Sequence, residues 1–149
     1  MNDKNFDNWD VVSQLINKSE FVGLKSINCF PKQPGEIEQG NREYKISLDF
    51  SHYSEKGVIN ILNKKATQMN FRLFEGGGSA IYFIGVADNG DTTGISIVKL
   101  FISLLYFTKI VLISKCKFKK IRIYKGVNGY LATIRVYKKI DYINLLLEL

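Results

Sequence analysis

Residues 36–96 decide the fold, and they read EIEQGNREYKISLDFSHYSEKGVINILNKKATQMNFRLFEGGGSAIYFIGVADNGDTTGIS. The segment 43–50 alternates, with the apolar residues Tyr44, Ile46, Leu48 and Phe50 on one side and Glu43, Lys45, Ser47 and Asp49 on the other. Successive side chains of a strand point to opposite faces. The alternation therefore predicts a strand with one buried face, and it places Glu43 on the other face.

A long amphipathic helix follows this strand. Ser54 and Glu55 are typical of a helix start. Apolar residues then recur every three or four positions, at Val58, Ile61, Leu62, Ala66, Met69 and Leu73, which predicts one buried helix face. The glycines at 76–78 are expected to end the helix, because glycine readily adopts the left-handed conformation of a C-terminal cap.

The end of the segment predicts a central strand and a tight turn. Residues 80–87 form a nearly unbroken apolar run, which is expected of a strand covered on both faces. Asp88-Asn89-Gly90 then favours a turn, because asparagine and glycine accept positive φ.

This segment resembles the N-terminal accessory domain of the GTP-binding protein 1 and 2 family, which are translational GTPases related to elongation factor 1A. The resemblance covers less than half of the chain and rests on Glu38, Gly40, Asn41, Glu43, Tyr44, Lys45, Thr67, Gln68, Met69, Arg72, Leu73, Glu75, Gly76, Gly78, Tyr82, Ile84, Gly85, Val86, Asp88, Asn89, Gly90 and Gly94. It departs from the family after Gly94, where an apolar run over 95–107 replaces an acidic helix, and the later hairpin is shorter. The resemblance implies a cytoplasmic, non-catalytic accessory module whose partner is RNA, the ribosome or its own GTPase domain.

The chain has 149 residues, which is the length of one domain. We expect an N-terminal helix and connector over 1–35, with the helix at 5–18, and a single α+β domain over 36–149. The two cysteines, Cys29 and Cys116, have no metal or redox spacing and are expected to be thiols in a reducing compartment.

The segment 94–115 predicts a helix over 96–108, which packs on the sheet, and then a strand over 110–118. A membrane span is not expected, because nine residues separate Lys99 from Lys109 and a span would bury both lysines. The helix is apolar around more of its circumference than one sheet face requires. We therefore expect it to cover a partner domain or to form a homodimer with a second copy of the chain.

Positive charge is concentrated in the last third of the chain. Residues 1–98 hold 10 Lys+Arg and 12 Asp+Glu, whereas residues 99–149 hold 11 Lys+Arg and 2 Asp+Glu. A basic surface confined to one part of a domain is typical of binding to a polyanion. A lysine-rich surface that only provides solubility is the alternative.

Asn128-Gly129 predicts a hairpin with a two-residue turn. This turn would pair Val127 with Tyr130, Ile123 with Ile134, and Ile121 with Val136, on one apolar face. It would also place Arg122 opposite Arg135, Lys120 opposite Tyr137, and Tyr124 opposite Thr133. Cations interleaved with tyrosines suit single-stranded RNA, because phosphates pair with the cations and bases stack on the rings. The candidate RNA-binding residues are Lys115, Lys117, Lys119, Lys120, Arg122, Tyr124, Arg135 and Tyr137.

The sequence argues against catalysis by this segment. His52 is the one histidine, which excludes a metal site built from several histidines. No G-x-x-x-x-G-K-[ST] motif occurs, so the chain is not itself a GTPase and needs no cofactor of its own; GTP and Mg²⁺ are implied only for a GTPase domain that would follow Leu149 in a longer protein.

One enzymatic alternative remains. Glu38, Glu43 and Lys45, followed by a helix, a glycine stretch and G-V-x-D, also resemble the Schlafen core of the AlbA-like type, some members of which cut RNA with clustered carboxylates and a divalent metal. Glu38, Glu43 and Asp88 would then be the ligands. A protein-interaction module without an RNA role is the third class. In each case we expect an α+β two-layer sandwich, with a mixed or antiparallel sheet of about five strands and two to three helices.

Overall fold

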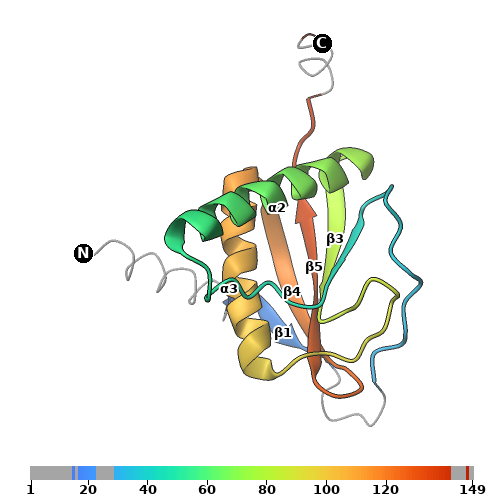
Figure 1. Cartoon of the computed structure of the whole chain (residues 1–149). Helices are drawn as coiled ribbons and strands as arrows, with labels where there is room; N and C mark the ends of the chain where they lie inside the picture. Colours follow the sequence, from blue (N-terminus) through green and yellow to red (C-terminus); the bar gives the residue numbers. More distant parts are fainter. Residues whose placement is uncertain (1–14, 16, 23–28, 142–146, 148–149) are drawn as a thin grey trace.

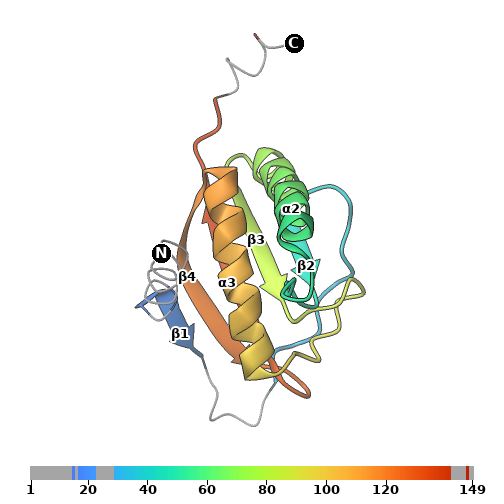
Figure 2. The same cartoon turned by 60° about the vertical axis from the view of Figure 1, so that its left-hand side comes forward.

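The computed structural model describes residues 15, 17–22, 29–141 and 147. In this part of the chain a five-stranded sheet carries two helices on one face, as Figures 1 and 2 show. The elements are β1 (Ser19–Phe21), β2 (Arg42–Lys45), α2 (Glu55–Glu75), β3 (Ser79–Ile84), α3 (Ile97–Ser114), β4 (Lys117–Lys125) and β5 (Tyr130–Tyr137). The predicted α+β class and the five-stranded mixed sheet are confirmed.

The strands lie side by side in the order β1-β4-β5-β3-β2. The two outer pairs, β1 with β4 and β2 with β3, are parallel, and the two inner pairs are antiparallel. Parallel neighbours need a crossover connection, and α2 provides it between β2 and β3. The predicted helix over 5–18 lies outside the described residues except for its last turn, where Leu15 is 2% exposed and belongs to the core.

Helix α2 begins and ends where the sequence predicts. The Ser54 side chain accepts a hydrogen bond from the Gly57 amide at 3.1 Å and caps the first turn. At the other end the Gly78 amide donates to the Leu73 carbonyl at 2.7 Å. Gly78 has φ +104°, a value that glycine adopts without steric cost. The predicted apolar face is buried against the sheet and α3 through Leu62, Ala66, Met69 and Leu73.

The prediction for residues 94–118 is partly wrong. Helix α3 does not stop at 108 but continues to Ser114, so the strand expected over 110–118 begins only at Lys117. The reason is that Ile110, Val111 and Ser114 continue the buried helix face. Lys115 ends the helix in the left-handed conformation, with φ 58°.

The strand predicted over 43–50 is also shorter, because β2 ends at Lys45. Beyond it the Leu48 amide donates to the Ser103 hydroxyl of α3 at 2.9 Å, so the backbone leaves the sheet for a side-chain partner. Both faces of β2 are covered, which corrects the expected placement of Glu43. Tyr44 is 1% exposed on one face and Glu43 is 0% exposed on the other.

The β4–β5 hairpin has the predicted faces but a different register. The apolar residues Ile121, Ile123, Ile134 and Val136 are all buried against the helices. However, Ile121 pairs with Ile134 and Arg122 with Thr133, two residues away from the predicted pairing. The connecting loop spans 126–129, because its backbone is held from outside by bonds from the amides of Val127 and Asn128 to residues 92 and 93. A shift of two residues preserves the faces. It also places Thr133, and not Arg135, opposite Arg122, so the predicted like-charge pair across the two strands does not exist.

Candidate functional site

The face of the sheet that carries no helix has most of the candidate RNA-binding residues on it. On β4 and β5 these side chains alternate with the buried set that faces the helices. The loop 29–41 covers one end of this face, where Phe30 packs on Phe83 and the Tyr44 hydroxyl donates to the Pro34 carbonyl at 2.8 Å. We call the uncovered remainder the open face, and it comprises Ser79, Ile81, Lys117, Lys119, Lys120, Arg122, Thr133, Arg135 and Tyr137.

The cations of the open face are exposed, whereas its centre is half-buried. Lys117, Lys119, Lys120, Arg122 and Arg135 are the exposed members. Ser79, Ile81, Thr133 and Tyr137 are intermediate in burial. The face therefore has a weakly polar floor with cations around it, an arrangement that offers contact surface and positive charge together.

Two of these cations have polar partners within the described residues. The Arg135 guanidinium donates to the Ser79 hydroxyl at 2.8 Å. Lys120 Nζ lies 3.0 Å from the Glu20 carboxylate of β1, and its ammonium lowers the pKa of that carboxyl below its ordinary value. Both partners of this ion pair are substantially exposed, so it is screened by solvent. Sequence reasoning missed Glu20 because the alternating pattern of a three-residue edge strand is too short to detect.

Two predicted residues do not join the open face. The Tyr124 ring lies 4.6 Å from the Phe30 ring and belongs to the second core under the loop 29–41. Lys115 is exposed, but it stands at the turn between α3 and β4. The structure thus brings six of the eight predicted residues together and separates these two.

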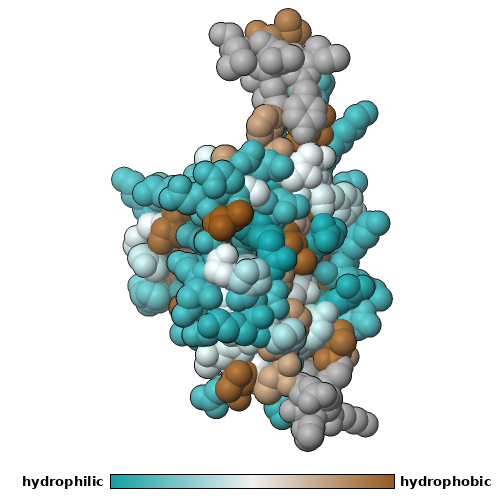
Figure 3. Space-filling model, turned by 90° about the vertical axis from the view of Figure 1, so that its right-hand side faces the viewer, coloured by the Kyte–Doolittle hydropathy of each residue, from teal (hydrophilic) through white to brown (hydrophobic). Residues whose placement is uncertain are grey.

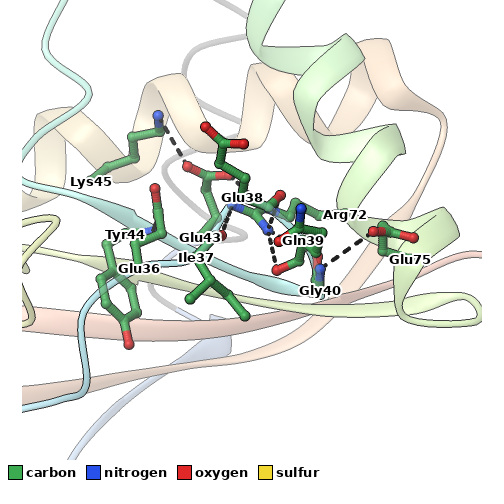
Figure 4. A network of polar contacts seen from close by, with 10 residues as sticks. All are labelled: Glu36, Ile37, Glu38, Gln39, Gly40, Glu43, Tyr44, Lys45, Arg72 and Glu75. Carbon is green, nitrogen blue, oxygen red and sulfur yellow. Dashed lines mark hydrogen bonds and ion pairs between the residues drawn. The ribbon is translucent and has the colours of Figure 1, made fainter.

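A second polar cluster lies between β2, α2 and the loop before β2, and Figure 4 shows it. Its centre is Arg72, which is 4% exposed. The Arg72 guanidinium donates to Glu43 Oε1 at 2.8 Å and to the carbonyls of residues 37, 38, 39 and 40 at 3.0–3.1 Å. Glu43 Oε2 lies 3.2 Å from Lys45 Nζ. Buried charges need such compensation, so this network fixes the loop onto the helix and the strand.

A hollow of about 290 Å³ lies beside this network. Its lining consists of Glu36, Ile37, Glu38, Gln68, Phe71, Arg72 and Asp88. Burial raises the pKa of the Glu36 carboxyl, and the neighbouring carboxylates of Glu43 and Asp88 act in the same direction, against a hydrogen bond from the Tyr44 amide. Figure 3 views the side of the molecule on which the loop 29–41 lies, and it is mostly hydrophilic with small separate hydrophobic patches.

The three carboxylates of the metal-dependent alternative, Glu38, Glu43 and Asp88, do not form one site. Glu38 and Asp88 do line the same hollow. Glu43, however, is buried beside Arg72 and Lys45. In the described part of the chain no three histidine, cysteine, aspartate or glutamate side chains are close enough to hold one metal ion. The chemistry of the cluster is therefore that of a structural ion-pair network.

Helix α3 is long and apolar enough to cross a membrane, by length and composition alone. Here it packs on the sheet, and 44% of its residues are buried. Its outer side leaves Val98 67%, Leu112 68% and Ile113 42% exposed. The excess apolar surface predicted for this helix is thus present, although the helix is longer than predicted.

The remaining reactive side chains do not form a catalytic arrangement in the described residues. His52 is exposed and its ring lies 4.6 Å from that of Tyr53. Cys29 is an exposed free thiol. Cys116 is buried, lies 3.5 Å from the Met69 sulfur, and burial raises its pKa to about 11. A thiol with a raised pKa is a poor nucleophile at neutral pH.

The fold and these sites define a small α+β domain with a basic open face and a structural ion-pair network. Over 67 residues the chain is 43% identical to GTP-binding protein 2 of mouse and to GTP-binding protein 2 of human. The matched segment covers 44% of this chain but 10% of each of those proteins, so it corresponds to a small part of their length. No family model matches the chain, and no solved structure matches it. The similarity links part of this chain to a GTP-binding protein.

The residues on which the family resemblance rests mainly hold the fold. Glu43 and Arg72 form the buried ion pair. Gly40, Gly85 and Gly90 have positive φ, and a Cβ atom on Gly90 would lie 1.9 Å from the Gln33 carbonyl oxygen. None of the candidate RNA-binding residues is among them. The resemblance therefore supports a common fold for this segment, and the open face has to be judged on its own chemistry.

Proposed function

We propose that this chain is a non-catalytic accessory domain related to a segment of a GTP-binding protein, and that it binds RNA, free or in the ribosome, through the open face. The observation that carries the proposal is the charge on that face. Five exposed cations stand on it, and within the described strands Glu20 is the one carboxylate on the same side. Phosphates bind such a surface by releasing counterions.

The test is a titration of fluorescein-labelled single-stranded RNA, followed by fluorescence anisotropy at several salt concentrations. If about five phosphates are neutralised, the logarithm of the association constant should fall with the logarithm of salt concentration with a slope of about −3.5. The double variant Arg122→Glu, Arg135→Glu should weaken binding strongly and keep the fold, because both side chains are exposed.

The control makes the same charge change on the helical layer. Lys56 and Lys64 are both exposed on α2, so Lys56→Glu, Lys64→Glu alters the net charge equally but leaves the open face intact. We expect this variant to bind RNA nearly as well as the parent. An equal loss of RNA affinity in both double variants would show that binding depends on net charge alone. Unchanged binding by the open-face variant would exclude the open face as the site.

A docking role for α3 is a second candidate function, favoured by the exposure of Val98, Leu112 and Ile113. The partner we propose is the GTPase domain of a longer protein, with a second copy of this chain as the alternative. Sedimentation velocity of the parent and of Leu112→Glu tests the second copy as the partner. Self-association that disappears in Leu112→Glu would indicate a homodimer, whereas a parent that is monomeric at all concentrations would exclude it.

A further inference from the structure

A β-bulge changes what β4 presents on the open face. The pairing with β5 is regular from Lys125 to Ile121 and again from Phe118 to Lys117, with a shift in between. Phe118 and Ile121 are both buried, and the two residues between them, Lys119 and Lys120, are both exposed. In a regular strand consecutive side chains point to opposite faces. Bulges commonly redirect a side chain in this way.

The two lysines reach in opposite directions across the same face. Lys119 Nζ lies over the Tyr137 ring of β5, 5.6 Å from the centroid. Lys120 Nζ lies beside Glu20 of β1. The bulge thus leaves two consecutive lysines exposed, and one of them, Lys119, lies next to an aromatic ring.

Tyr137 is the last residue of β5, whereas Phe30 packs near the first residue of that strand, where the Phe30 amide donates to the Lys125 carbonyl. It pairs with Lys117 on one side and with Ser79 on the other. Arg135, two residues earlier on the same face, donates to the Ser79 hydroxyl. Cations thus surround the ring on two strands. Tyr124, by contrast, is in contact with Phe30 and is not available.

We propose that Tyr137 is a base-stacking platform, with Lys119 and Arg135 holding the adjacent phosphates, so that the open face selects single-stranded over duplex nucleic acid. This inference rests on the proposed binding of RNA. Binding of a stacked nucleotide needs an aromatic ring for the base and a nearby cation for the phosphate, and both occur here on two neighbouring strands. Lys119 is exposed and has a flexible side chain, so its ammonium group can move off the Tyr137 ring and bind a phosphate. A duplex keeps its bases paired and cannot use the ring.

The experiment compares three ligands on the full chain, each followed by fluorescence anisotropy at one salt concentration. These are an oligouridine, an abasic strand of the same length, and an RNA duplex. The parent should bind the oligouridine more tightly than the other two. Since stacking contributes about 1–3 kcal/mol per base, Tyr137→Ala should weaken oligouridine binding by about 5- to 150-fold and leave abasic binding nearly unchanged.

Tyr137→Phe keeps the ring and should retain the affinity, while Tyr53→Ala removes an exposed tyrosine elsewhere and serves as the control. Circular dichroism shows whether Tyr137→Ala is folded. If it is not, the comparison of oligouridine with the abasic strand on the parent decides alone. If the parent binds the oligouridine and the abasic strand with equal affinity, the stacking role of Tyr137 is wrong, although the proposed RNA binding by the basic face is not affected. If the parent binds none of the three ligands, the proposed function falls as well.

Discussion

Arg72→Met should be among the most destabilising single substitutions in this domain. The guanidinium is 4% exposed and its main partner, Glu43, is 0% exposed. Removing one member of a buried ion pair costs about 3–5 kcal/mol, because the other charge stays buried without its partner. Here Lys45 Nζ remains 3.2 Å from the second carboxylate oxygen, and the carbonyls of 37–40 lie in a part-exposed loop that water can reach. Both effects soften the loss, so we expect about 3 kcal/mol.

Urea unfolding followed by circular dichroism measures this loss. With a dependence of about 1–3 kcal/mol per molar urea, the midpoint should fall by about 1–3 M. Arg122→Met, an exposed arginine, is the matched control and should change the free energy of unfolding by less than about 0.5 kcal/mol. Adding Glu43→Gln to Arg72→Met should cost less than the sum of the two single changes, since the unpaired charge is then gone. A loss below about 1 kcal/mol for Arg72→Met would refute the structural role assigned to the pair.

Three further predictions concern stability. Lys115→Gly should raise the free energy of unfolding, measured by thermal unfolding, by about 0.5–1 kcal/mol, because Lys115 has φ 58° and glycine adopts this conformation freely. The same change should leave RNA affinity nearly unchanged, because Lys115 lies off the open face. Gly90→Ala should cost about 1–3 kcal/mol or more, because φ is +92° and the new Cβ would meet backbone at 1.9 Å, whereas Gly35→Ala, with 3.7 Å to the nearest atom, should be neutral. The pKa of Glu36 is raised above its ordinary value of 4.5 by burial, so its contribution to stability is present below that value and lost as the pH rises through the folded-state pKa. Glu36→Gln should therefore reduce the loss of stability above pH 4.5 in urea titrations across the acid range, and an unchanged pH profile would contradict the assignment.

Part of the candidate site was predictable because it depends on alternation alone. The period of two in β4 and β5 separates Arg122 and Arg135 from the buried isoleucines in any register that preserves the faces. Tyr124 has the same parity, and nothing local distinguishes it from Tyr137. The difference arises because the loop 29–41 crosses the sheet and brings Phe30 onto one ring and not onto the other.

The sequence by itself determined the local elements. A serine cap and the glycines at 76–78 set the two ends of α2, the apolar run specifies the buried strand β3, and the basic residues cluster after position 98. Each of these features depends only on neighbours along the chain, so it can be found from the sequence. Only the tertiary structure decided the burial of Glu43 beside Arg72, the docking of β1 beside β4, the four-residue loop at 126–129 and the bulge at Lys119 and Lys120. Those features depend on which distant segment supplies the missing hydrogen-bond or charge partner, and that choice is made between surfaces that meet only when the chain has folded.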